Sequence, residues 1–181
     1  MQQKSKKGAE DNVHPVTQIN VEIKDDIITL YNNGNGIDVE KHPEYNLWIP
    51  EMIFAHLRTS TNYNKSEKKI TGGKNGFGFK LVLIWSIYGS IETIDHIRGL
   101  KYTQEFENNL DIIHKPKITK SKSKPYTKVS FKPDYKRLEM NGLSQQMLAL
   151  FQRRVYDIAG VTTKDVKVKY NDGIIKTNDF Q

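Results

Sequence analysis

Polar and apolar residues alternate over several short stretches of the chain, and alternation with a period of two predicts half-buried β-strands. Gln18–Ile23 is followed by a turn at Asp25–Asp26 and by a second stretch at Ile27–Tyr31, so a hairpin is expected there. Further strands are predicted at Ser90–Asp95, Lys101–Glu107, Leu110–His114, Thr127–Phe131, Asp165–Tyr170 and Ile174–Ile175. The last two flank an Asp-Gly turn and are expected to form another hairpin.

Three other segments space their apolar residues as helices do. One helix is expected to start near Pro50, a second near Gly78, and a third after Ser144, whose side chain can cap it. The third is expected to end at Ala159, because a glycine follows. Both tryptophans of the chain are expected in the core.

The order of these elements indicates the fold class. Sequential strands read as hairpins, and helices are interspersed among them. We therefore predict an α+β fold, a two-layer sandwich in which a mostly antiparallel sheet carries helices on one face. Residues 1–12 are polar and are expected to be frayed or disordered, so the folded domain is expected to cover residues 13–181.

Composition limits the cellular compartments and the kinds of partner that are expected for the chain. Its 181 residues include no cysteine and no apolar run near the ~20 residues that a membrane span needs, so an intracellular protein without a membrane partner is expected. The net charge of +7 suits either a polyanionic partner or a solvated lysine-rich surface. The segment Lys115–Lys124 holds five lysines, and we expect a solvated loop there rather than a DNA contact.

The segment Thr71–Lys80 combines four of the twelve glycines with two lysines and an asparagine. Glycines let the backbone approach a ligand closely, and lysines attract anions, so the segment is expected to hold phosphate groups. It is not a P-loop, because Phe79 stands where that motif needs lysine. It is not a Rossmann loop either, because Leu81 stands where the third glycine belongs.

Two further polar clusters accompany the glycine-rich segment. Asn33-Gly34-Asn35-Gly36 directly follows a predicted strand, where an amide can bind an adenine amino group. Thr59-Ser60-Thr61-Asn62 follows the first helix and offers groups for sugar hydroxyls or phosphate oxygens. Together the three clusters predict a nucleotide held under a lid.

These clusters resemble the ATP site of eukaryotic-type type II DNA topoisomerases, members of the ATPase superfamily that includes gyrase, heat-shock chaperones, histidine kinases and mismatch-repair proteins. The resemblance continues through Thr127–Asp134, Arg153–Gly160 and Val166–Asn171, and covers about residues 11 to 180. It implies a Bergerat-type ATP-binding fold, ATP and Mg²⁺ as cofactors, and residues 13–181 as an ATP-binding domain.

The resemblance also implies roles for individual residues. Asn33 would contact adenine, and Ser60, Thr61 and Asn62 would contact ribose and phosphate. The loop from Gly73 to Lys80 would surround the triphosphate. Phe79 replaces a small residue of the family, which is hard to accommodate beside phosphates. The nucleotide-binding residues implied are Asn12, Asn33, Ser60, Thr61, Asn62, Gly73, Lys74, Asn75, Gly76, Phe77, Gly78, Phe79 and Lys80.

The family's catalytic helix is where this chain departs from the pattern. Asp11 and Asn12 match the end of that helix, but counting back puts Gly8 at the Mg²⁺-ligand position and Lys4 at the general-base position. A protonated lysine cannot accept a proton. No catalytic or metal-ligating residue is assigned, and the five histidines lack metal-ligand spacing. Binding of ATP without hydrolysis is expected.

The resemblance sets the expectation for the whole protein as well. We expect the chain to be most of one ATPase domain, without the family's first segment and without the DNA-cleaving region. The complete enzyme would be a homodimer, in the nucleus or in a viral factory, that uses ATP to pass one DNA duplex through another. The alternative is a non-hydrolysing nucleotide-binding or basic DNA-binding module.

Overall fold

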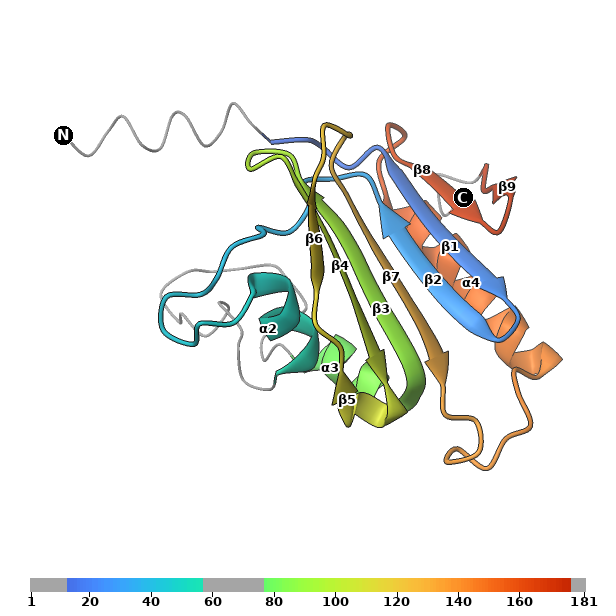
Figure 1. Cartoon of the computed structure of the whole chain (residues 1–181). Coiled ribbons are helices and arrows are strands. Elements are labelled where there is room, and N and C mark those ends of the chain that lie inside the picture. Colours follow the sequence, from blue (N-terminus) through green and yellow to red (C-terminus); the bar gives the residue numbers. More distant parts are fainter. Residues whose placement is uncertain (1–12, 57–76, 177–181) are drawn as a thin grey trace, which may run out of the picture.

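A computed structural model describes residues 13–56 and 77–176 of the chain. Nine strands form one sheet in the order β5-β4-β3-β7-β2-β1-β8-β9, with β6 also pairing with β4 (Figure 1). All pairs are antiparallel except β1 with β8. The strands are β1 (Gln18–Lys24), β2 (Ile27–Asn32), β3 (Ser86–Asp95), β4 (Leu100–Glu107), β5 (Ile112–Ile113), β6 (Lys117–Lys120), β7 (Tyr126–Pro133), β8 (Lys167–Tyr170) and β9 (Gly173–Ile174).

Three α-helices in the described part lie on one face of this sheet: α2 (Ile49–Ala55), α3 (Gly78–Ile84) and α4 (Gln145–Val161). In Figure 1, α4 crosses behind β1 and β2, α3 lies behind the lower ends of β3 and β4, and α2 lies next to α3, to the left of β6. No described helix covers the opposite face, which we call the open face. The predicted α+β class, with a mostly antiparallel sheet and helices on one face, is confirmed.

Apolar side chains of the helix-covered face form two clusters. The larger one joins α2 and α3 to the middle of the sheet and has as its buried members Val39, Phe54, Leu83, Ile91, Tyr102, Phe106 and Val129. The smaller one joins α4 to β1 and β8 through Val21, Val155, Ala159, Val168 and Ile175. Each strand contributes every second residue, because successive side chains of a strand point to opposite faces.

Several local predictions are confirmed. The first hairpin pairs β1 with β2 across residues 25 and 26. Helix α3 starts at Gly78, and the Ser144 hydroxyl accepts a hydrogen bond of 3.2 Å from the Met147 N–H at the start of α4. Helix α4 continues to Val161, two residues beyond the predicted end.

Three other predictions are wrong. Trp85 is 41% exposed and stacks on the Arg137 guanidinium, 4.1 Å from the ring centre, and is no core residue. The lysine-rich segment is not a plain loop, because four of its residues form β6; lysines on an outer strand discourage pairing with other chains. The strand predicted from Leu110 instead begins as a turn, since residues 108–110 have φ of 50–68°.

Candidate functional site

Asn32 and Asn33, at the end of β2, point their side chains to opposite sides of the sheet. Asn32 pairs in register with Thr127 of β7, which pairs with Thr93 of β3, and this row lies on the helix-covered face with Ile28 and Leu30. Asn33, the next residue, leaves the strand on the other side. The amide of Asn32 is therefore the one beside the threonine hydroxyls.

The Asn33 side chain forms hydrogen bonds with Thr17 and Gln18, at the start of β1. Its Oδ1 accepts hydrogen bonds from the backbone N–H groups of Thr17 (2.9 Å) and Gln18 (2.8 Å), and its Nδ2 donates to the Thr17 hydroxyl (2.7 Å). These contacts fix the start of β1 against the end of β2. The role of Asn33 at adenine stays a prediction, and this geometry gives the side chain a structural task.

The threonine row is tied to the loop that follows β2. Thr93 is fully buried, and its hydroxyl accepts from the Ile37 N–H (2.9 Å), donates to the Tyr126 carbonyl (3.0 Å) and lies 3.2 Å from the Thr127 hydroxyl. Gly36 runs so close to β3 that an added Cβ would lie 1.9 Å from the Ile94 carbonyl oxygen. A hollow of about 390 Å³ opens between this loop, α2 and the end of β3.

Asp95 holds the same loop from the end of β3. Its carboxylate is 4% exposed and accepts hydrogen bonds from the N–H groups of Val39 (2.9 Å), Ile97 (3.0 Å) and Arg98 (2.9 Å). The Arg98 guanidinium binds the same carboxylate at 2.9 Å and reaches Glu40 at 2.6 Å. Burial alone would raise the pKa of Asp95, but the hydrogen bonds and the guanidinium outweigh it and lower the pKa.

We expect Asp95→Asn to lower the free energy of unfolding by about 2–4 kcal/mol at pH 7, because a buried charge-assisted network loses its anion. A lowered native pKa gives stability that is present above the unfolded pKa of about 3.9 and is lost as pH falls through the native value. Urea unfolding at pH 7 and pH 3 tests this, since the variant should lose less stability on acidification. Equal acid sensitivity of both proteins would contradict it.

Helix α2 is fixed to the sheet by a buried polar chain. The Tyr102 hydroxyl donates to Gln104 Oε1 at 2.6 Å, and Gln104 Nε2 donates to Glu51 Oε2 of α2 at 3.0 Å. Tyr102 is fully buried and Gln104 is 2% exposed. Burial raises the pKa of Tyr102 far above its usual value, so the hydroxyl stays protonated and donates. These hydrogen bonds tie the start of α2 to β4.

The described end of the glycine-rich segment lies at the start of α3. Lys80 is 2% exposed, in the first turn, and burial lowers the pKa of its ammonium group. The ring of Phe79 makes edge-on contacts with Phe54 and Phe131, at 5.2 and 5.8 Å between ring centres. This ring joins the core under α2, and the predicted conflict between Phe79 and phosphates stays a prediction.

The structure brings together only part of the predicted site. It describes Asn33, Phe77, Gly78, Phe79 and Lys80. The other implied residues lie outside the described ranges: Asn12, Ser60, Thr61, Asn62, Gly73, Lys74, Asn75 and Gly76. Within the described ranges 13–56 and 77–176, no group of three or more His, Asp or Glu side chains is placed to hold a metal ion. No helix in these ranges is long and apolar enough to cross a membrane.

Sequence reasoning missed Asn32, Thr93, Thr127 and Asp95. A signal for Asn32 was present, because counting by twos from Ile28 along β2 reaches it on the apolar face. The threonines and Asp95 carried no such signal, since they meet the loop only through strand pairing across the sheet.

Known proteins share this architecture. DNA topoisomerase 2 of Acanthamoeba polyphaga mimivirus is 45% identical over 166 residues, which are 92% of this chain and 13% of that protein. The crystal structure of the ATPase region of Saccharomyces cerevisiae topoisomerase II matches with a TM-score of 0.87 at 46% identity, covering 91% of this chain and 44% of that one. No protein-family model matches the chain.

A more distant structure shares the fold alone. The ATPase domain of Thermus thermophilus gyrase B matches with a TM-score of 0.67 at 19% identity. This chain spans about an eighth of the length of the viral topoisomerase, and the matched part of the yeast protein is its ATPase region. The chain therefore belongs to the DNA topoisomerase 2 family and corresponds to part of that family's ATPase region.

Proposed function

We propose that this chain binds ATP on the helix-covered face of the sheet, beside the end of β2. The observation that carries the proposal is the row of Asn32, Thr127 and Thr93, an amide and two hydroxyls next to the loop at Gly36. An amide can both donate to and accept from an adenine edge, and the close packing of Gly36 on β3 holds the loop next to these polar groups. Asn32 takes the adenine role that the resemblance gave to Asn33.

The triphosphate is proposed to extend from there toward α3. Lys80 in the first turn of α3 is the cation for the phosphates, with the loop from Gly73 around them and Ser60–Asn62 at the ribose. Mg²⁺ is proposed to enter with ATP. Because Gly8 stands at the family's metal-ligand position and has no ligating side chain, the ion would rely on the phosphates there.

Hydrolysis by this chain is not part of the proposal, because Lys4 at the general-base position cannot accept a proton. The whole protein is proposed to be a type II DNA topoisomerase that couples ATP to the passage of one DNA duplex through another. Its partners would be duplex DNA and a second copy of itself, in the nucleus or in a viral factory. The support is the similarity to topoisomerases of a virus and of yeast.

Calorimetric titration of the purified chain with ATP and Mg²⁺ tests the binding proposal. We expect weak binding that Lys80→Met abolishes, because methionine keeps the buried stem of the side chain and removes its charge. Phosphate release should stay at background. Failure to bind ATP would overturn the site, and Mg²⁺-dependent phosphate release that Lys80→Met lacks would overturn the absence of hydrolysis.

A further inference from the structure

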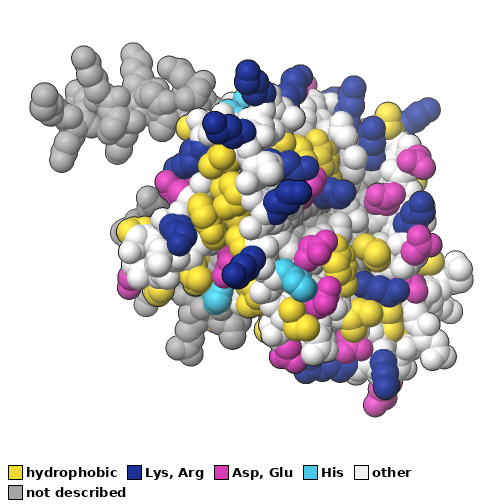
Figure 2. Space-filling model, in the orientation of Figure 1, with side chains coloured by type: hydrophobic (Ala, Val, Ile, Leu, Met, Phe, Trp, Pro, Cys, Tyr) yellow, Lys and Arg dark blue, Asp and Glu magenta, His cyan; other side chains and the backbone are white. Residues whose placement is uncertain are grey.

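The open face of the sheet is hollowed over its central strands. The hollow has a volume of about 510 Å³ and is lined by side chains of β3, β4 and β7 and by residues 114–117, which lead into β6. Figure 2 views this face and shows Lys and Arg side chains gathered around and above the hollow. It lies across the sheet from the proposed ATP site, and its volume is within the ~300–1,000 Å³ of ligand sites.

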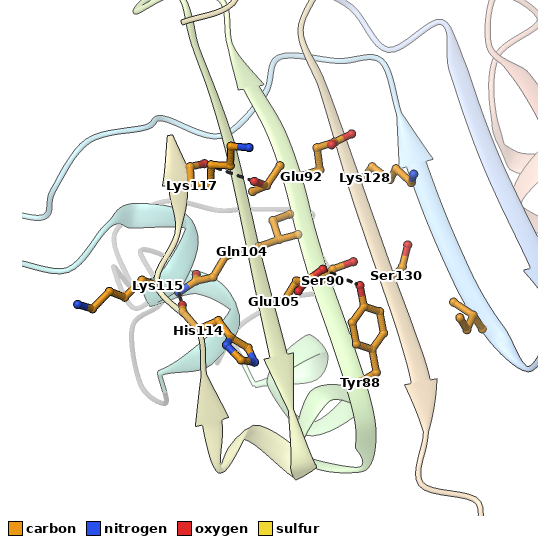
Figure 3. Close-up of a pocket in the computed structure, with 13 residues that line it drawn as sticks. Tyr88, Ser90, Glu92, Gln104, Glu105, His114, Lys115, Lys117, Lys128 and Ser130 are labelled. Carbon is orange, nitrogen blue, oxygen red and sulfur yellow. Dashed lines mark hydrogen bonds between the residues drawn. The ribbon is translucent and has the colours of Figure 1, made fainter. Parts of the chain in front are cut away.

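The floor of the hollow is made by small hydroxyl side chains. Ser90 of β3 and Ser130 of β7 stand opposite each other, and the Ser130 hydroxyl lies 2.9 Å from that of Thr29 on β2. Larger side chains rise around them (Figure 3). Tyr88 stands at one side, where its hydroxyl donates to Glu105 at 3.3 Å and so holds the ring in place.

Two lysines stand on opposite sides of the hollow in a single row of paired residues. Lys117 of β6 pairs with Thr103, which pairs with Glu92, which pairs with Lys128 of β7. Three strand spacings of about 4.8 Å separate the two lysine backbones by roughly 14 Å. That span is too wide for one phosphate group and suits a chain that carries repeated negative charges.

The charges within the row favour an anion. Glu92 forms an ion pair with Lys101 at 2.7 Å and accepts a hydrogen bond of 2.6 Å from the Tyr126 hydroxyl, so its charge is compensated. In the described part of the chain, neither Lys117 nor Lys128 has a carboxylate oxygen within 4.0 Å. Lys128 interacts electrostatically with the nearby Glu92, but neither lysine is held in a close ion pair among the described residues, so both can contact an anionic ligand.

Aromatic side chains continue the same surface. Tyr31 pairs with Lys128 on the adjacent strand, and its ring lies 5.5 Å from that of Tyr126. Tyr88 stands on the opposite side of the hollow from this pair. An open sheet face that combines lysines with aromatic rings is the arrangement on which unpaired bases stack while phosphates meet the cations.

We propose that the open face binds a single strand of nucleic acid, with phosphates at Lys117 and Lys128 and an unpaired base against Tyr88. Single strands fit better than a duplex, because bases in a duplex are paired and cannot stack on a side chain within a hollow. This site goes beyond the proposed ATP binding and does not depend on it.

Fluorescence anisotropy with a labelled twelve-residue oligothymidine tests the proposal over a range of salt concentrations. We expect the double variant Lys117→Gln, Lys128→Gln to bind several-fold more weakly and to reduce the slope of log K against log salt by about 1.4, which is two single-strand phosphate contacts. The matched control is Lys136→Gln, Lys164→Gln, which removes the same charge from exposed lysines that do not line the hollow. It should keep the wild-type slope.

Variants of Tyr88 distinguish the contribution of base stacking to oligonucleotide binding from that of charge. Tyr88→Ala should weaken binding about fivefold to a hundredfold without changing the salt slope, and Tyr88→Phe should stay near the wild type. Circular dichroism confirms that each variant is folded, and Lys80→Met should bind the oligonucleotide as the wild type does. Three results would overturn the proposal: no binding by the wild type, an equal loss in the control pair, or equal competition by duplex DNA or by inorganic tripolyphosphate.

Discussion

Asn32→Ala is expected to weaken ATP binding by about tenfold, because the buried edge of the adenine base loses its amide partner. Asn32 lies on the helix-covered face in register with Thr127, and among the described residues its Oδ1 accepts one hydrogen bond, of 3.2 Å, from the Gly34 N–H of its own turn. No described residue accepts from its Nδ2, which can therefore donate to a ligand. The fold should lose little, since no strand depends on this contact.

Asn33→Ala is the matched comparison. It removes three hydrogen bonds that hold the start of β1, so it should lower the free energy of unfolding by about 1–2 kcal/mol while changing ATP affinity less than Asn32→Ala does. Calorimetric titration with ATP and urea unfolding, run on both variants, separate the two effects. A greater loss of affinity in Asn33→Ala would show that the adenine contact belongs to Asn33.

The sequence predicted those features of the fold that depend on a few neighbouring residues. The turn at residues 25 and 26, the cap at Ser144 and the start of α3 each depend on a few consecutive residues, and each was found where expected. The class of the fold followed from the same signals, because hairpins favour antiparallel pairing.

Contacts between segments that are distant in the sequence could not be predicted from it. The parallel pairing of β1 with β8 joins residues about 150 positions apart, and nothing near either strand encodes it. Asp95 is likewise an ordinary acidic residue in sequence, and its task appears only when the loop after β2 lies against the end of β3. Trp85 is exposed, and the residue that stacks on its ring, Arg137, comes from another loop that the sequence around Trp85 does not indicate.

The choice between Asn32 and Asn33 lies between these cases. The period of β2 places Ile28, Leu30 and Asn32 on one face, so the sequence held the information. The run of asparagine and glycine after the strand drew attention to Asn33 instead. Strand pairing favours Asn32, because it puts Asn32 beside Thr127 and gives Asn33 the start of β1 as its partner.

Gly36→Ala is expected to cost about 3 kcal/mol or more of unfolding free energy, at the upper end of overpacking changes. The added Cβ would lie 1.9 Å from the carbonyl oxygen of Ile94 and 2.9 Å from the Thr93 hydroxyl. The first is a backbone atom of β3, a strand paired on both sides, so it cannot move aside as a flexible side chain could. Either the loop after β2 moves away or the strand distorts, and both displace Thr93 from Ile37.

Two other glycines of the predicted motifs serve as controls for this expectation. Gly78 has no described atom within 4 Å of an added Cβ, so Gly78→Ala should be neutral or slightly stabilising at the start of α3. At Gly34 the nearest atom, at 2.7 Å, is a methyl group of the exposed Val16, which can shift at small cost. Urea unfolding of the three variants should therefore rank Gly36→Ala well below the other two, and equal stability would show that the loop does not need this close approach to β3.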